Sequence, residues 1–281
     1  MKRSLSLILC LVMCLSVFIF PVYAGTEDAD PFTRALSLVF PVSGSRDISA
    51  ALELLLPLAE SSDAEAQYYC GWIYDFELED SVENDAVALS WYEKAMESGV
   101  LKAYVAAALY PYAESLDECE KLLEQAFSQG FLDLSEDELG ADGLFWMGLM
   151  HDIGYGLNQD YEKALLYYSK AAERCNVPAM KSCADMYLFA LGTEQNYALA
   201  ARCYDAAANF GYAPAMYELG LIYQNGLGTE PDCELAMNYF IDAFVNGFDA
   251  ASGMIEYMKL SGEGMGTYNE RAAEYTAHAN P

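Results

Sequence analysis

A sequence pattern that returns every 36 residues constrains the fold of this chain more than any other feature. Small residues, aromatic residues and glycine pairs recur at the same offsets through most of its length. The six units are 66–102, 103–142, 143–178, 179–214, 215–250 and 251–281, of which the second is degenerate and the last is nearly complete. Such a period is typical of a repeat protein, in which each unit buries its apolar face against its neighbours. We therefore expect a stack of similar units.

Each unit reads as two helices joined by a glycine turn. In the third unit, Gly154 and Gly156 form the turn, because only glycine adopts positive φ at little cost. Asp160 then stands at the N-cap of the second helix, where its carboxylate can accept a backbone hydrogen bond. A small residue on the first helix lets the second helix approach closely, and this position holds Gly71, Gly148, Ala184 and Gly220. Most tyrosines recur at fixed offsets and are therefore expected in the core.

The spacing of these residues resembles the Sel1-like repeat, a relative of the tetratricopeptide repeat. The pattern is Ala-x3-[Leu/Cys/Met]-Gly-x2-Tyr-x2-Gly-x-Gly-x3-Asp-x3-Ala-x2-Tyr-Tyr-x2-Ala. Its two small residues are 16 apart in three units: Gly148 to Ala164, Ala184 to Ala200, and Gly220 to Ala236. The resemblance implies an all-α fold, a right-handed α/α superhelical solenoid of about six helix-pair repeats. Residues 25–65 would form an N-terminal linker and capping helices.

The resemblance also implies a function. As a family, Sel1-like proteins are adaptors that hold protein complexes together or present a groove to a partner, and some secreted bacterial members act in host interaction or envelope biology. The chain is therefore expected to be a protein-binding solenoid and not an enzyme. Two alternatives stay open. One is a weak hydrolase of envelope material, for which 103–142 is the place to look, and the other is a purely structural envelope component.

The first 24 residues have the layout of a secretory signal peptide. Lys2 and Arg3 form a short positive segment, the run 5–20 is strongly apolar, and Val22 and Ala24 are small residues at the −3 and −1 positions. Cleavage after Ala24 would leave a soluble chain with no stable membrane anchor. The alternative is a retained anchor, although the apolar run is short for a membrane span. The sequence thus predicts a secreted protein or one of the periplasm or cell envelope.

The charge balance excludes one class of partner. The chain has 14 basic and 43 acidic residues, a net charge of −29. A nucleic-acid-binding protein needs lysine and arginine to displace counterions from phosphates, so nucleic acid is excluded. The acidity either serves solubility or provides a surface for a basic protein or peptide.

The sequence carries no familiar pattern of a catalytic, metal or cofactor site. It has no nucleophile elbow, no P-loop, no His-Glu-x-x-His and no Cys-x2-Cys pair. The histidines are His151 and His278, and His151 replaces a repeat tyrosine, which favours a packed ring over a metal ligand. We therefore expect no metal, no cofactor and no catalysis.

Six cysteines follow residue 24, and an even number in an exported protein suggests disulfides. Most of them stand where other units have core residues, so buried thiols are the competing interpretation. Cys183 and Cys203 lie at similar heights on the two helices of one unit and are the best candidate pair. A cysteine-rich branch of the family staples its helices with two cysteines per repeat, but this chain does not keep that placement.

One stripe on the first helix of each unit is expected to face neither the second helix nor the next unit. It falls at offsets +2, +6 and +9 from the first residue of the unit. Its aromatic and acidic residues suit a groove for a partner helix or an extended peptide with basic residues. The alternative is that some of them are buried against the neighbouring unit. The stripe consists of Tyr68, Trp72, Asp75, Phe145, Leu149, Asp152, Lys181, Asp185, Leu188, Tyr217, Leu221 and Gln224.

The degenerate unit departs from the repeat pattern in two places. Pro111 stands where the first helix should continue, so a shortened helix and a local change of curvature are expected. The segment from Ser135 to Glu138 has the pattern of a capping box that opens the next helix, rather than that of a calcium loop.

Overall fold

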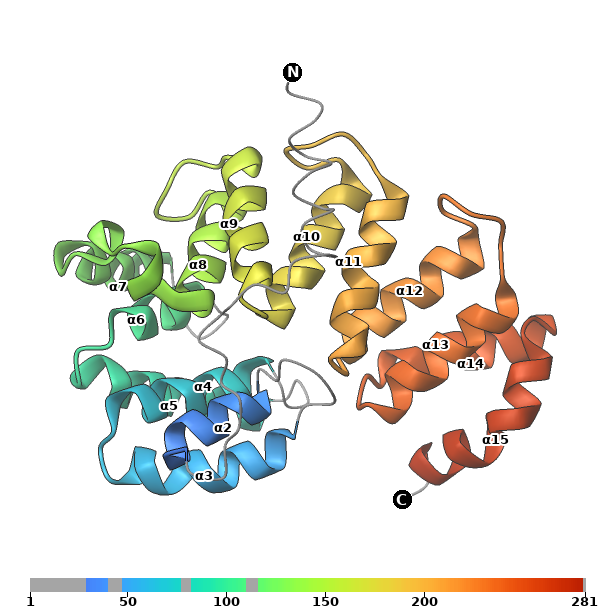
Figure 1. Ribbon diagram of the computed structural model, residues 1–281, viewed down its shortest axis with the longest axis horizontal. Coiled ribbons are helices and arrows are strands. Elements are labelled where there is room, and N and C mark those ends of the chain that lie inside the picture. Colours follow the sequence, from blue (N-terminus) through green and yellow to red (C-terminus); the bar gives the residue numbers. More distant parts are fainter. Residues whose placement is uncertain (1–28, 40–46, 77–81, 110–115, 280–281) are drawn as a thin grey trace.

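The computed structural model of the chain is an all-helical stack, which confirms the predicted α-solenoid (Figure 1). It describes residues 29–39, 47–76, 82–109 and 116–279, and within these ranges it has fourteen α-helices, one short 3-10 helix and no strand. The elements are α2 (Pro31–Val39), α3 (Ile48–Glu60), α4 (Ala64–Phe76), α5 (Val82–Glu97), α6 (Leu101–Leu109), α7 (Leu116–Ser128), η1 (Phe131–Asp133), α8 (Glu136–Ile153), α9 (Tyr161–Glu173), α10 (Val177–Phe189), α11 (Tyr197–Asn209), α12 (Ala213–Asn225), α13 (Cys233–Val245), α14 (Ala250–Ser261) and α15 (Met265–Ala279).

The helices follow one another as pairs along an arc. α4 packs against α5, α8 against α9, α10 against α11 and α12 against α13, while α3 packs between α2 and α4 ahead of the first pair. Figure 1 shows the arc running from α2–α5 over α8–α11 to α13–α15, so that α2 and α15 lie at opposite ends. In the last unit α15 packs along α13 instead of closing on α14.

Two sequence predictions fall on parts of the chain that the structure does not describe. The signal peptide, residues 1–24, and Pro111 both lie outside the described residues. Among the helices that are described, none has the length and apolar character needed to span a lipid bilayer.

Polar caps set the start of the second helices, as the sequence predicts. Asp160, Asn196 and Asp232 are the N-caps of α9, α11 and α13, and each side chain accepts a backbone N–H three residues on at 3.0–3.1 Å. Such a cap stabilises a helix by about 1 kcal/mol. The first helices of two of these units end at Gly154 and Gly226, whose φ angles are 71° and 65°.

The small residue on each first helix is required by the packing. A Cβ on Gly148 would lie 2.5 Å from the ring of Tyr168, and one on Gly220 would lie 2.5 Å from the ring of Phe240. Both rings are fully buried. The predicted role of this position, which is to let the second helix approach, is confirmed.

The glycine turn also makes the contact between successive units. A Cβ on Gly192 would lie 2.4 Å from the carbonyl carbon and oxygen of Tyr161, the first residue of α9 in the preceding unit. In the same way, a Cβ on Gly228 would lie 2.7 Å from the Cβ of Tyr197 on α11. A side chain at either glycine would therefore push two units apart.

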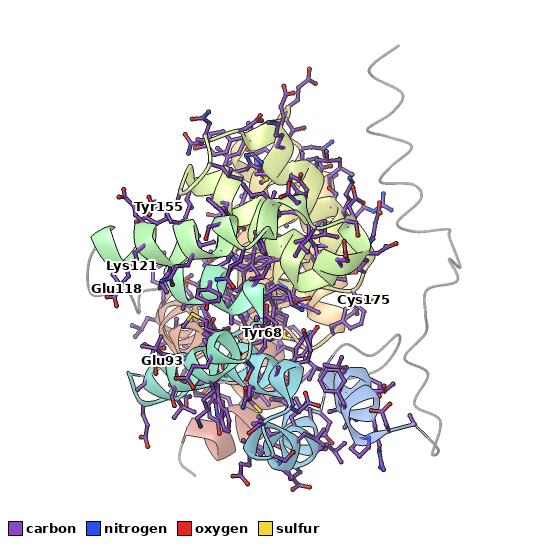
Figure 2. The ribbon with its side chains drawn as sticks, turned by 90° about the vertical axis from the view of Figure 1, so that its left-hand side faces the viewer. Tyr68, Glu93, Glu118, Lys121, Tyr155 and Cys175 are labelled. Atoms are coloured by element: carbon purple, nitrogen blue, oxygen red, sulfur yellow. The ribbon has the colours of Figure 1, made fainter. Side chains whose placement is uncertain are left out.

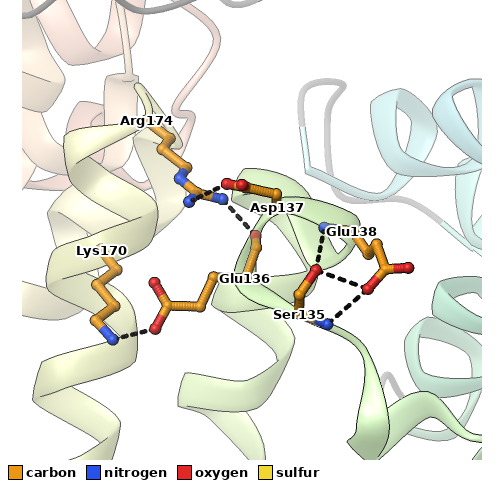
Figure 3. A network of polar contacts seen from close by, with 6 residues as sticks. All are labelled: Ser135, Glu136, Asp137, Glu138, Lys170 and Arg174. Atoms are coloured by element: carbon orange, nitrogen blue, oxygen red, sulfur yellow. Dashed lines mark hydrogen bonds and ion pairs between the residues drawn. The ribbon is translucent and has the colours of Figure 1, made fainter.

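A capping box and two ion pairs hold the start of α8 (Figure 3). The Ser135 N–H donates to the Glu138 carboxylate at 2.8 Å, and the Glu138 N–H donates to Ser135 Oγ at 3.4 Å, which confirms the predicted box. Lys170 of α9 pairs with Glu136, and Arg174 of α9 pairs with Asp137. The start of α8 is thereby fastened to the helix that follows it.

Candidate protein-binding surface

The N-terminal part of the predicted stripe is core and is closed to a partner. Tyr68 and Trp72 on α4 are fully buried, and Figure 2 shows Tyr68 inside the helical stack. Trp146 Nε1 donates to Tyr68 Oη at 2.9 Å, and the rings of Trp72 and Trp146 meet edge to face at 5.6 Å between centroids. Phe145 is also buried, and its ring centroid lies 5.7 Å from that of Trp72. The prediction that Tyr68, Trp72 and Phe145 line an open groove is wrong.

Contacts between α4 and α8 explain this burial. The aromatic side chains of α4 pack on those of α8, so positions expected to line a groove become the core of a junction. Leu188, in the predicted stripe on α10, is only 7% exposed and is also packed, so its placement in an open groove is wrong as well.

A buried ion pair lies in the same junction. Lys102 Nζ on α6 lies 2.9 Å from Asp142 Oδ2 on α8 and 3.3 Å from Glu65 Oε2 on α4. The ammonium also lies 4.7 Å from the centre of the Tyr68 ring, within range of a cation–π interaction. Burial lowers the pKa of Lys102, but the negative charge of Asp142 and other nearby groups outweighs it, and the net shift is upward. Lys102 and Asp142, which we call the junction pair, thus help to join three helices.

Beyond the junction, three carboxylates from successive units lie close enough to interact. Asp152 on α8 accepts a hydrogen bond from Tyr168 Oη at 3.1 Å. Asp185 on α10 accepts one from Tyr204 Oη. The third is Glu218 on α12, which interacts electrostatically with Asp185. We call Asp152, Asp185 and Glu218 the carboxylate row.

The carboxylate row is crowded with negative charge. Burial raises the pKa of Asp152, the Tyr168 hydrogen bond lowers it, and the charge of Asp185 raises it further. Burial also raises the pKa of Glu218, where the charge of Lys181 lowers it and that of Asp185 raises it. Lys181 Nζ lies 2.8 Å from Asp185, but among the residues the structure describes no basic side chain forms an ion pair with Asp152 or Glu218. A cation supplied by a partner would relieve this repulsion.

The remaining residues of the predicted stripe lie in two places, on the helices of the carboxylate row and in the first unit. Leu149, Tyr217, Leu221 and Gln224 are half-buried on the helices that carry the row. Asp75 instead accepts a hydrogen bond from Tyr92 Oη within its own unit, at 2.8 Å.

Sequence spacing alone misses Glu218, which stands at offset +3 rather than +2, +6 or +9. Residues three apart on a helix lie on one face, so offset +3 adjoins the stripe at +6. The signal that could have found Glu218 is its acidic side chain next to Tyr217, in the unit that follows that of Asp185.

Cys183 and Cys203, the candidate disulfide pair, do not form a disulfide. The six cysteines in the part of the chain that the structure describes form no disulfide. Cys183 and Cys203 are both buried, and Cys183 Sγ lies 3.8 Å from Ser169 Oγ on α9. Both therefore serve as core residues, the competing interpretation of the sequence.

The structure supports the interpretation of His151 as a packed ring. It is buried and stacks on Tyr167, with ring centroids 5.7 Å apart. Nowhere in the described ranges do three His, Cys, Asp or Glu side chains gather in a way that could hold a metal ion.

The fold and this surface define an α-solenoid that presents charged and aromatic side chains from the first helices of its units. The family model described as "Sel1 repeat" matches residues 64–100, 141–174, 177–212 and 213–243. The chain thus contains Sel1 repeats, as its spacing predicts. Sel1 repeat proteins are generally scaffolds for protein–protein interaction, built on a fold that is generally non-catalytic.

Several solved structures are similar to this chain. A Sel1 repeat protein from Oxalobacter formigenes is 24% identical with a TM-score of 0.48, over 75% of this chain and 84% of that one. A sel1 repeat protein from Klebsiella pneumoniae subsp. pneumoniae is 19% identical with a TM-score of 0.46, over 73% and 97% of the two chains. An immunity protein from Pseudomonas aeruginosa is 25% identical with a TM-score of 0.38, over 67% and 66%. No curated protein matches the chain in sequence.

Proposed function

We propose that the chain is an exported scaffold that binds a basic protein or peptide through the carboxylate row. Protein scaffolding is the general role of the family. The observation that carries the more specific proposal is the row itself. Asp152 and Asp185, from successive units, each accept a hydrogen bond from a tyrosine hydroxyl, and burial and the like charge of Asp185 raise the pKa of Asp152 and Glu218.

Carboxylates in this state favour an incoming cation. Burial has already removed part of their hydration, so a lysine or arginine of a partner can form charge-assisted hydrogen bonds at a smaller desolvation cost. The net charge of −29 would speed the approach of a basic partner at low ionic strength. Tyr217 and Leu221, half-buried beside the row, would supply apolar contact.

Neutralising the carboxylate row with amides of the same shape should weaken binding about 100-fold, because cations of the partner lose their counter-charges. The partner is first captured by residues 25–281 from envelope and culture-supernatant extract and identified by crosslinking mass spectrometry. Its affinity is then measured by calorimetry. The row variant carries Asp152→Asn, Asp185→Asn and Glu218→Gln.

A matched control separates the row from the overall charge. It removes three exposed carboxylates on second helices: Glu120→Gln, Glu124→Gln and Glu162→Gln. This control should bind within about twofold of the wild type, since exposed charges act mainly on the association rate. An equal loss in both triple variants, or no loss in either, would rule out the row as the binding surface.

The same affinity should depend on pH. The carboxylates bind a cation in their ionised form, so affinity falls as pH drops through their pKa values. Because burial raises the pKa of Asp152 and Glu218, this fall should begin at a higher pH than for ordinary carboxylates. In the row variant the affinity should show much less of this dependence.

Export is a separate part of the proposal and has its own test. If signal peptidase cleaves after Ala24 as proposed, protein recovered from the envelope or the medium should begin at Gly25 when sequenced from its N-terminus. An intact N-terminus in the membrane fraction would instead show that the apolar segment is kept as an anchor.

A further inference from the structure

The last helix pair departs from the regular packing and has a carboxylate at its small-residue position. At the position that is Gly or Ala in the regular units, the last unit has Glu256. The carboxylate accepts hydrogen bonds from Tyr275 Oη at 3.1 Å and from Lys259 Nζ at 2.7 Å. α15 packs mainly along α13 rather than on α14, and its Arg271 Nη2 lies 2.8 Å from Asp242 Oδ1 of α13.

This packing leaves an apolar face of α14 uncovered. Leu260 is 89% exposed and Tyr257 is 57% exposed. In regular units the second helix covers the position of Leu260: Tyr168 of α9 reaches Asp152 there, and Leu188 at the same offset is buried. We call Tyr257 and Leu260 the α14 face.

By repeat offset, the α14 face extends the line of positions that carries the carboxylate row. α12 and α14 are the first helices of successive units, and both pack on α13 (Figure 1). Tyr257 stands at the same offset in its unit as Leu221 on α12 and Asp185 on α10. A ligand that lies along the first helices would meet carboxylates on α8 to α12 and then apolar side chains on α14.

We propose that the α14 face anchors an apolar side chain of the basic partner, so that the surface selects a cationic amphipathic segment. This inference rests on the proposed function. Charge complementarity decides the occupant. A second copy of the chain would bring another net charge of −29 to a surface that already carries the carboxylate row, whereas a cationic segment is attracted by it.

Two synthetic peptides of equal length and charge test the inference by fluorescence anisotropy. One places leucine and lysine on opposite faces of a helix, and the other has serine in place of leucine. The wild type should bind the leucine peptide about tenfold more tightly, as expected for burial of one or two apolar side chains. The α14 variant, Tyr257→Ser with Leu260→Ser, should bind both peptides equally.

The variants are chosen so that folding does not interfere. Tyr257 and Leu260 are more than half exposed, so their replacement removes little packing from the folded state. The matched control is Leu166→Ser, which alters another exposed leucine, 46% exposed on α9, and should keep the tenfold preference.

The outcomes distinguish this inference from the proposed function. If the α14 variant keeps the preference for the leucine peptide, the anchor is overturned. If the row variant binds both peptides as the wild type does, the proposed function fails, even where the α14 variant loses the preference. A wild-type dimer in sedimentation that Leu260→Ser dissociates would assign the α14 face to a second copy and would overturn the inference.

Discussion

Asp142→Ala is expected to lower the free energy of unfolding by about 3–5 kcal/mol, because it leaves a buried ammonium without its counter-charge. Asp142 Oδ2 lies 2.9 Å from Lys102 Nζ, and the two side chains are 3% and 12% exposed. Of the two carboxylates that pair with Lys102 in the described residues, Glu65 would remain, at 3.3 Å and half exposed. Urea unfolding followed by far-ultraviolet circular dichroism measures the loss.

Two further variants separate the charge from the packing. Asp142→Ala combined with Lys102→Met removes both charges, and should be clearly more stable than Asp142→Ala alone. Asp137→Ala removes a carboxylate that is 96% exposed and paired with Arg174, and should cost less than about 1 kcal/mol. A loss for Asp142→Ala no larger than that for Asp137→Ala would show that the junction pair does not stabilise the fold.

The junction pair also bears on how the solenoid unfolds. In a stack, each unit touches mainly its neighbours, so stability is carried from unit to unit. The pair joins α6 to α8, and the Tyr68–Trp146 hydrogen bond joins α4 to α8. In Asp142→Ala, the helices ahead of α8 should therefore unfold in a separate step before the remaining units.

Features encoded within one unit could be predicted from the sequence. The turn glycines, the N-cap at Asp160 and the capping box at Ser135 all depend on the chemistry of a few neighbouring residues. The helix pairs can be predicted from the same spacing. A small residue such as Gly148 is needed because a ring of the second helix packs directly on it. These signals were enough to derive the fold.

The candidate surface was predictable only where the units are regular. Placing Tyr68 and Trp72 in a groove assumes that α4 has the neighbours of a regular unit, but Trp146 of α8 packs against both. Asp152 and Asp185 lie between regular units, and there the stripe contains two members of the carboxylate row. Glu256 is visible in the sequence as a break in the pattern. The packing of α15 along α13 could not be derived from that break, because it depends on contacts between two units.

Gly192→Ala is expected to destabilise the protein by about 2–5 kcal/mol, the sum of a backbone and a packing cost. Gly192 has φ of 66°, a left-handed conformation that costs a residue with a side chain about 1–2 kcal/mol. The new Cβ would also lie 2.4 Å from the carbonyl of Tyr161. A backbone carbonyl cannot rotate away as a flexible side chain can, so the two units must separate, at a further cost of about 1–3 kcal/mol.

Gly211→Ala isolates the packing cost, and equilibrium unfolding of the two variants measures it. Gly211 has φ of 78°, and no atom lies within 4 Å of an added Cβ, so its substitution should cost only the backbone part. The excess for Gly192→Ala is then the cost of separating two units. The same two units carry Asp152 and Asp185, so Gly192→Ala should also weaken partner binding while Gly211→Ala leaves it unchanged. Equal losses of stability in the two variants would mean that the turn does not set the distance between units, and that the spacing of the carboxylate row depends on other contacts.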